Sequence, residues 1–535
     1  MRNKEKKSFI PETGPGNKNS LWFDILIATL FFLVSLIGII HHEMWRDELQ
    51  SWLVARDSHS LVQLFQNARF EGHPILWYLI LFILTSFTKS LFALQLLNLF
   101  LGTAFIFLFN KFSGFKKTEK ILFSFGYYSV FEFTMISRSY NLELLLIAAV
   151  LVLFNKSSKN FIWMFVTLFL LANVSAFGLL FAVCFGIIFL WDEKYNLRKI
   201  EQTKVSVSKY FSVVLIFIAG IIFSIIQIKP EQGNLVSTDA SSLFDFERIK
   251  IVFARISDAF FLFPELKILP YWNFSGTMRL DSQDLVLNLI LSFAIILACV
   301  VILWRKPETL LFFLAASAGI FLLCELPFLI AVRYTGRFFL AFVFSLWLGN
   351  YFDEKIFTNN FLNKISILGK KFQSIFLILI LISQVIAGVE YYFTDVKMPF
   401  SSSKQIASQI QKEHLDTLPI LGSQDYAVSS FSALLGKNIF YPESKTPGSF
   451  IIWDNQLRKN QNPDFGVVIE SINTVLDSSH QKALVILNTL PSGPNGKLEH
   501  DLVTPDIKID LLFQSEKCMV GDEYYYVFLA TRVPK

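Results

Sequence analysis

The sequence predicts a mainly α, polytopic membrane protein of about eleven transmembrane helices with a small extracytoplasmic α/β domain at its C-terminus. Of its 535 residues, 53% are hydrophobic and only 17% are charged, whereas a soluble domain carries about a quarter charged residues. Apolar runs recur up to about residue 394, and Pro, Ser, Asn and charged residues return beyond it. We therefore expect three parts: 1–20 as a cytoplasmic tail, 21–394 as a transmembrane domain and 395–535 as a soluble domain.

A helix of roughly twenty apolar residues crosses a bilayer. The run 161–191 is too long for one span, and we divide it at its polar cluster, Asn173–Ser175. Pro74–Phe87 is short, as expected of an interfacial or re-entrant segment. The first run is too long for a signal-peptide core and lacks a small-residue cleavage site, so we expect it to be retained. The expected spans are 21–40, 91–112, 120–137, 140–155, 160–174, 177–191, 210–228, 285–304, 309–331, 337–352 and 372–393.

The lysine distribution predicts the orientation. With a cytoplasmic N-terminus and 74–87 not crossing, the lysine-rich segments 111–120, 192–209 and 353–371 all lie inside, as the positive-inside rule requires. The loops 41–73 and 229–284 and the C-terminal domain then lie outside. The net charge of +5 comes from these short loops, which does not indicate nucleic-acid binding. Abundant Phe, Lys, Ile and Asn are typical of an AT-rich bacterial genome, so we expect a bacterial inner (cytoplasmic) membrane protein.

The segment after residue 394 has the alternation of a small α/β domain. An amphipathic helix is expected at Ile406–Leu415, and the segment contains no nucleotide-binding glycine motif, GxSxG or HExxH. The four cysteines of the chain are scattered, which predicts neither a disulfide nor a metal cluster. Short strands are expected at Pro419–Gly422, Asn438–Tyr441, Ala483–Asn488 and Glu523–Thr531.

Polar residues concentrate in the first external loop, 41–73, which holds four of the seven histidines. Asp47 and Glu48 lie seven and eight residues past the first span. They are compatible with a solvated interfacial loop or the start of a helix. They are also placed for general-base catalysis, in which a carboxylate takes a proton from an acceptor hydroxyl. A phosphate leaving group would also need positive charge close by.

Two motifs in this loop carry a resemblance to a known family. Trp45-Arg-Asp-Glu48 and, about twenty residues later, Arg69-Phe-Glu-Gly-His-Pro-Ile-Leu-Trp-Tyr78 resemble the first external loop of GT-C glycosyltransferases. The similarity is to protein O-mannosyltransferases and lipid A aminoarabinose transferases. Shorter similarities lie at Ile136–Tyr140, Ser175–Phe177 and Val332–Arg337. The resemblance implies a GT-C fold and inverting transfer of a sugar from a polyprenyl-phosphate donor to a lipid, glycan or protein acceptor at the outer face.

The resemblance also implies roles for single residues. Asp47 matches the catalytic aspartate of the family and Glu48 its acidic neighbour, whereas Glu71 matches a glutamate that helps to bind a metal. A divalent metal ion is the only cofactor it implies. The chain departs from the family because no histidine lies between His73 and His414, and Arg138-Ser-Tyr140 replaces a second aspartate.

Arginines at the external ends of later spans are candidates for binding the donor phosphate. Arg138, Arg333 and Arg337, with Tyr334, are the expected donor-phosphate-binding residues, because guanidinium groups bind phosphate bidentately. The alternative for each arginine is snorkelling to a lipid phosphate. His73 and Tyr140 are the expected substrate-binding residues, although His73 would also suit a helix cap. Trp77 and Tyr78 are expected to anchor the chain at the membrane interface. His41 and His42 are expected to face lipid headgroups.

Two other functional classes remain open at this point. A transporter or flippase of lipid-linked sugars would place ionisable groups near the middle of the membrane, and the expected spans are nearly free of charge. A simple membrane anchor for the C-terminal domain would leave the acidic loop without a purpose. The expected partners are a polyprenyl-phosphate-linked sugar, an acceptor and membrane lipids, and no nucleic acid.

Overall fold

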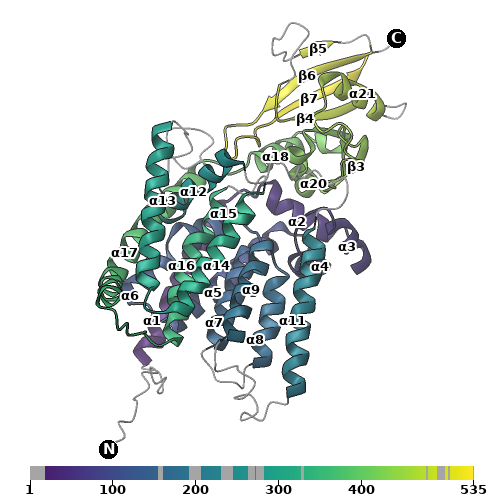
Figure 1. Ribbon diagram of the computed structural model, residues 1–535. Coiled ribbons are helices and arrows are strands. Elements are labelled where there is room, and N and C mark those ends of the chain that lie inside the picture. Colours follow the sequence, from purple (N-terminus) through teal and green to yellow (C-terminus); the bar gives the residue numbers. More distant parts are fainter. Residues whose placement is uncertain are drawn as a thin grey trace, which may run out of the picture.

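The computed structural model describes residues 18–154, 161–191, 207–229, 245–262, 272, 282–326, 331–476, 480–490, 501–503 and 506–533. The chain is mainly helical, and a helical bundle carries a smaller domain with a sheet at one end (Figure 1). We call this end of the bundle the site end, because the loop 41–73 also lies there. The opposite end holds the start of the first helix.

Six helices are long and apolar enough to cross a membrane, which identifies a multi-pass membrane protein. Five further helices that coincide with predicted apolar segments are shorter: α4 (Leu76–Phe87), α7 (Tyr140–Phe154), α8 (Phe161–Ala172), α9 (Ala176–Trp191) and α16 (Arg337–Leu348). The long helices are α1 (Lys18–His41), α5 (Leu91–Phe112), α11 (Val207–Ile228), α13 (Ser282–Leu303), α14 (Pro307–Cys324) and α17 (Asn360–Lys397). The count of eleven spans therefore stays a prediction.

Several predicted boundaries can be compared with these helices. The division at Asn173–Ser175 is confirmed, because α8 ends at Ala172 and α9 begins at Ala176. The expected span at 120–137 is not one continuous α-helix and stays a prediction: α6 (Lys117–Ser124) is followed by a π-helix, η1 (Tyr128–Met135). The wide turns of a π-helix shift the side chains that follow it. Of the loop 229–284, the structure describes α12 (Phe246–Phe260) and Trp272, whereas 230–244, 263–271 and 273–281 lie outside the described residues.

Helices α1 and α5 are antiparallel neighbours. The side-chain amide of Gln95, near the start of α5, donates to the carbonyl of Ile39, near the end of α1, at 3.3 Å. At the opposite end, the ammonium of Lys117 lies 5.2 Å from the ring of Phe23. The chain is therefore at the site end both where α1 ends and where α5 begins, with α4 between them.

A topology experiment checks this arrangement in the membrane. We expect a reporter active only outside the cytoplasm to be silent when fused after Phe115 and active when fused after Asp395. Phe115 follows α5 at the opposite end, whereas Asp395 contacts His42 at the site end, at 2.8 Å. Equal activity at both junctions would mean that the chain crosses the membrane once more between α1 and α5.

The C-terminal domain is an α/β unit, as predicted, with a seven-stranded sheet in the order β3-β2-β1-β4-β7-β6-β5. Strands β2, β1 and β4 are parallel, and the other neighbours are antiparallel. The expected helix corresponds to α18 (Ser403–Lys412), and the four expected strands are β1 (Ile420–Ser423), β2 (Ile439–Tyr441), β4 (Lys482–Leu487) and β7 (Tyr526–Arg532). Additional elements are α19 (Asp425–Val428), α20 (Ser430–Leu435), β3 (Thr446–Gly448), α21 (Phe465–Val475), β5 (Asp501–Val503) and β6 (Ile507–Gln514).

The loop 41–73 folds into α2 (Arg46–Arg56) and α3 (Leu61–Ala68), and α2 lies between the bundle and the C-terminal domain (Figure 1). The guanidinium of Arg46 donates to Asp522 at 2.7 Å, and its backbone N–H donates to Glu523 at 3.0 Å. The side chain of Gln50 bonds both the N–H and the carbonyl of Ile451, at 3.0 and 2.7 Å. Both domains thus hold the helix that carries Asp47.

Candidate active site

Asp47 lies in the first turn of α2, where a carboxylate also stabilises the positive end of the helix dipole. Its side chain is 31% exposed and contacts two guanidinium groups, Arg138 at 3.4 Å and Arg333 at 3.5 Å. Arg138 also donates to the backbone carbonyl of Asp47 at 2.8 Å. Burial raises the pKa of Asp47, but Arg138, Arg333 and Arg46 lower it, and the net result is a pKa below the usual value. Asp47 is therefore an ionised, accessible carboxylate between two cations.

Arg333 is held by aromatic rings and retains unused hydrogen-bond donors. It belongs to the short helix α15 (Val332–Thr335), and its guanidinium carbon lies 5.2, 5.0 and 5.0 Å from the rings of Trp45, Trp272 and Tyr334. Cation–π contacts of this kind hold a guanidinium without using its N–H groups. Among the described residues, the buried Nε and Nη1 atoms have no hydrogen-bond partner. Because unmade buried hydrogen bonds are costly, this guanidinium is suited to receive an anion.

Arg337 holds the neighbouring backbone of Arg333 and pairs with a buried carboxylate. Its Nε and Nη2 atoms donate to the two oxygens of Glu143, both at 3.1 Å, and Nη1 donates to the carbonyl of Arg333. The side chain is only 1% exposed, and its guanidinium carbon lies 4.2 Å from the ring of Phe177 and 5.1 Å from that of Tyr140. The donors of Arg337 are thus directed at Glu143 and at the backbone of Arg333, which differs from the expected direct role in phosphate binding.

The two expected tyrosines are packed beside these arginines. Tyr334 stacks on Phe177 with 5.8 Å between ring centroids, and Tyr140 lies against Arg337 and Phe133. Both side chains are buried. Their rings therefore shape the arginine side of the site.

Glu48 is fully buried, and its two oxygens hold neighbouring segments together. One oxygen accepts the backbone N–H of Ser137 at 2.6 Å, and the other accepts the N–H of Trp45 at 3.1 Å and contacts His42 at 3.1 Å. Ser137 precedes Arg138, so Glu48 sets the position of Asp47 relative to Arg138. This geometry is that of a positioning residue, whereas the expected part of Glu48 in catalysis stays a prediction.

His42 completes this buried network. Its second ring nitrogen contacts Asp395 of α17 at 2.8 Å. Burial lowers the pKa of His42, but Asp395 and Glu48 raise it to about 10, so the ring is a buried cation between two carboxylates. The expectation that His42 faces lipid headgroups is wrong, because its side chain is buried inside the protein.

Glu71 and His73 lie near Asp47 and are only partly buried. Glu71 accepts hydrogen bonds from Gln50 at 2.8 Å and Tyr78 at 3.0 Å. Burial raises the pKa of Glu71 to about 7, with Gln50 and Tyr78 opposing that rise. Burial and then Arg138 lower the pKa of His73 to about 4, so its imidazole is neutral at pH 7. Tyr78 itself is buried, which corrects its expected place as an interface anchor.

The divalent metal that the resemblance implies stays a prediction, and the described side chains offer no clustered donor set for it. Among the described residues, no three His, Cys, Asp or Glu side chains gather closely enough to hold one. The Glu71 oxygens are already bonded to Gln50 and Tyr78. Positive charge beside Asp47 is supplied by Arg138 and Arg333.

Sequence reasoning missed two buried carboxylates that lie close to the candidate site. Glu143 pairs with Arg337, and Glu132 in η1 accepts hydrogen bonds from Tyr127 and Trp272. The expectation of spans nearly free of charge is therefore wrong at these positions. Acidic residues inside apolar runs were the available signal, because a carboxylate buried in a membrane needs a specific partner. Both lie at the site end, next to Arg337 and Trp272.

Chemically, the site combines one accessible carboxylate, two arginines and the neighbouring polar side chains of Glu71 and His73. A carboxylate can accept a proton, and a guanidinium with free donors can stabilise a departing oxyanion. The aromatic rings around Arg333 exclude water and so strengthen these electrostatic interactions. No family model, curated protein or solved structure matches the chain.

Proposed function

We propose that the protein is an inverting GT-C glycosyltransferase that moves a sugar from a polyprenyl-phosphate donor to an acceptor hydroxyl at the outer face of a bacterial inner membrane. The observation that carries this proposal is the accessible carboxylate of Asp47 between Arg138 and Arg333, in contact with both. The reaction has two requirements. A base has to activate the acceptor, and cations have to stabilise the anionic leaving group.

Asp47 is the general base in this mechanism. The acceptor hydroxyl transfers its proton to the carboxylate while its oxygen forms a bond to the anomeric carbon of the sugar. The bond from this carbon to the phosphate oxygen breaks on the opposite face, which inverts the configuration. The electron pair leaves on the phosphate oxygen.

Arg138 and Arg333 bind the donor phosphate and stabilise the charge that develops on it. The unpartnered Nε and Nη1 atoms of Arg333 support this role, since each is a charged N–H donor that can bond an anionic oxygen. The same arginines lower the pKa of Asp47 in the free enzyme. Because a bound phosphate takes up their charge, donor binding raises the basicity of Asp47 when an acceptor arrives.

The second candidate, a transporter or flippase of lipid-linked sugars, is favoured by the buried Glu132 and Glu143. Both carboxylates have defined partners, however, and these are parts of the arginine and aromatic cluster beside Asp47. A structural role in holding that cluster accounts for both residues.

A deletion strain distinguishes the two candidates. We expect one sugar to disappear from an envelope glycan, lipid or protein, and a polyprenyl-phosphate sugar to accumulate. The wild-type chain should restore the parental profile, which mass spectrometry of envelope fractions would measure. If only the distribution of the lipid-linked sugar between the two leaflets changes in the deletion strain, the protein is a transporter.

A further inference from the structure

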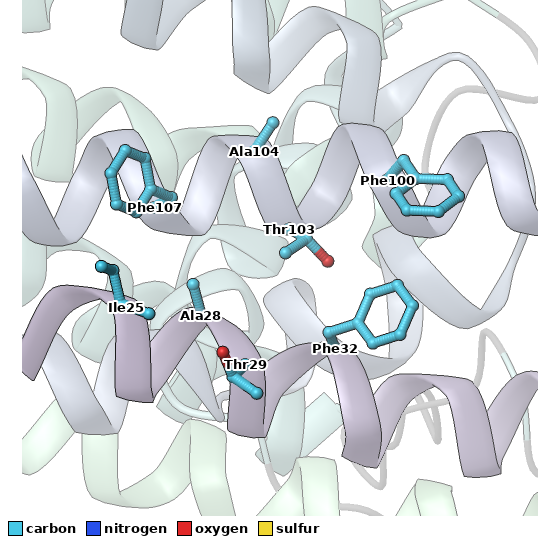
Figure 2. A pocket seen from close by; sticks show the side chains of 8 residues that line it. All are labelled: Ile25, Ala28, Thr29, Phe32, Phe100, Thr103, Ala104 and Phe107. Atoms are coloured by element: carbon cyan, nitrogen blue, oxygen red, sulfur yellow. The ribbon is translucent and has the colours of Figure 1, made fainter. Parts of the chain in front are cut away.

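The groove between α1 and α5 has a volume of about 430 Å³ and a mainly apolar lining, with Phe32 and Phe100 closing one end, 5.6 Å apart (Figure 2). Nothing among the described residues shows what covers it. The junction between α2 and the C-terminal domain is different, because its contacts are polar and both partners belong to the described part of the chain. This junction begins at Arg46, directly beside Asp47.

Arg46 is the first residue of α2 and is bonded to the C-terminal domain through both its side chain and its backbone. Its guanidinium donates to Asp522 at 2.7 Å, and the guanidinium carbon lies 5.2 Å from the ring of Tyr426. Its backbone N–H donates to the fully buried carboxylate of Glu523 at 3.0 Å. The first N–H groups of a helix have no intrahelical partners and attract negative charge. The C-terminal domain therefore stabilises the turn of α2 that carries Asp47.

The position of the Asp47 carboxylate depends on the backbone of α2. Its contacts with Arg138 and Arg333, at 3.4 and 3.5 Å, are longer than the roughly 2.7–3.2 Å of ordinary N–H···O hydrogen bonds. The backbone is held more closely, because Arg138 donates to the carbonyl of Asp47 at 2.8 Å. The contacts of Arg46 hold the preceding residue. Loss of the Arg46 side chain should thus displace Asp47.

The donor side of the site has supports of its own. Trp45 lies 5.2 Å from the guanidinium carbon of Arg46 and also 5.2 Å from that of Arg333. Its ring is held as well by Trp272 and Phe400, with ring centroids 4.6 and 6.3 Å away. Arg333 also lies against Trp272. Arg333 should therefore stay in place when the side chain of Arg46 is removed.

We propose that Arg46 is a positioning residue for the reaction: by pairing with Asp522 and Glu523, it fixes the first turn of α2, and with it Asp47, against the C-terminal domain. The role of Arg46 rests on the proposed function of Asp47 as the general base. A catalytic group misplaced by about 1 Å can cost about a hundredfold in rate. The C-terminal domain thus takes part in catalysis by placing the base.

The first test is kinetic. Arg46→Gln should lower kcat of the reconstituted full chain by about ten- to a hundred-fold, and it should leave the binding of a polyprenyl phosphate without its sugar unchanged. The variant should stay folded, because Gln50 still pairs with the backbone of Ile451. Asp522→Asn should show a smaller loss of the same kind. The double variant should be no slower than Arg46→Gln alone, because the two side chains act through one contact.

The second test measures the same contact without a substrate, by amide hydrogen exchange of the full chain in lipid nanodiscs. In Arg46→Gln, the amides of the first turn of α2, residues 46–49, should exchange about tenfold faster, because a hydrogen bond to a charged group is lost. The amides of the last turn, residues 53–56, should keep their wild-type rates.

Arg56→Gln is the matched control. Arg56 ends the same helix, its side chain is 15% exposed, compared with 19% for Arg46, and it pairs with Asp57 at 2.7 Å. Its substitution should change neither kcat nor exchange in the first turn. Unchanged kcat or exchange in Arg46→Gln, weaker binding of the polyprenyl phosphate, additive losses in the double variant, or an equal loss in Arg56→Gln would each overturn the proposal. If Asp47→Asn is active, the general-base assignment fails instead.

Discussion

Replacing Asp47 with asparagine is expected to lower kcat by about a hundred- to ten-thousand-fold, the usual contribution of a general base. Asparagine has nearly the same size and can still accept hydrogen bonds from Arg138 and Arg333, but it cannot take a proton from the acceptor. Donor binding should be retained, because the substitution removes a negative charge from beside the phosphate site. Turnover of the protein reconstituted with a polyprenyl-phosphate sugar measures the effect, and direct binding of the donor separates affinity from rate.

Asp57→Asn is the matched control for this substitution. Asp57 follows the last residue of the same helix. Its side chain is 29% exposed, compared with 31% for Asp47, and it also contacts an arginine, Arg56, at 2.7 Å. Nothing places Asp57 beside Arg138 or Arg333, so its substitution should leave kcat nearly unchanged. Near-normal turnover of Asp47→Asn would show that this carboxylate is only a polar part of the surface, and the proposed mechanism would fail.

Replacing Arg333 with lysine is expected to reduce kcat/KM by about ten- to a hundred-fold. A hydrogen bond to a charged group contributes about 1.5–3 kcal/mol, and a lysine lacks the planar fork that binds two phosphate oxygens. The charge is conserved, so the loss reports on geometry and should be largest in donor affinity. Steady-state kinetics with varied donor concentration measure it.

Arg305→Lys is the control for Arg333→Lys. The side chain of Arg305 is 12% exposed, against 11% for Arg333, but it lies at the opposite end, where it contacts Glu354 and Gln373. Its substitution should leave kcat/KM unchanged. Arg337→Lys should instead lower the amount of folded protein, because it disrupts a buried bidentate ion pair with Glu143. If Arg333→Lys has normal kinetics at normal protein levels, Arg333 does not bind the donor phosphate.

The local pattern predicted the elements of the C-terminal domain that have strong alternation or apolar runs. β1 and β4 lie within one residue of their expected positions, and α18 lies within three. β3 was missed because it is a three-residue strand, Thr446–Gly448, that exists only through its pairing with β2. β6 likewise depends on its neighbours β5 and β7. These partner strands are consecutive in the sequence, but the pattern of one strand taken alone does not show that it pairs with the next.

The candidate site shows the same division. The acidic loop drew attention to Asp47, and the arginines at the ends of apolar runs drew attention to Arg138 and Arg333. Sequence spacing did not show that Glu48 faces inward to His42 and Ser137, because α2 has to be docked before its faces differ. The partners of Arg337 and Arg333 lie in η1, α7 and the isolated Trp272, far away in the chain.

The sequence by itself determined that this is a multi-pass membrane protein with a C-terminal α/β domain, because composition and hydropathy report directly on the surrounding solvent. It also determined which polar residues stand out against the apolar background. Only the tertiary structure decided which of these are accessible and which are buried supports. The reason is that Asp47 and Glu48 are adjacent and chemically alike, yet the docking of α2 leaves the first 31% exposed beside two arginines and buries the second completely.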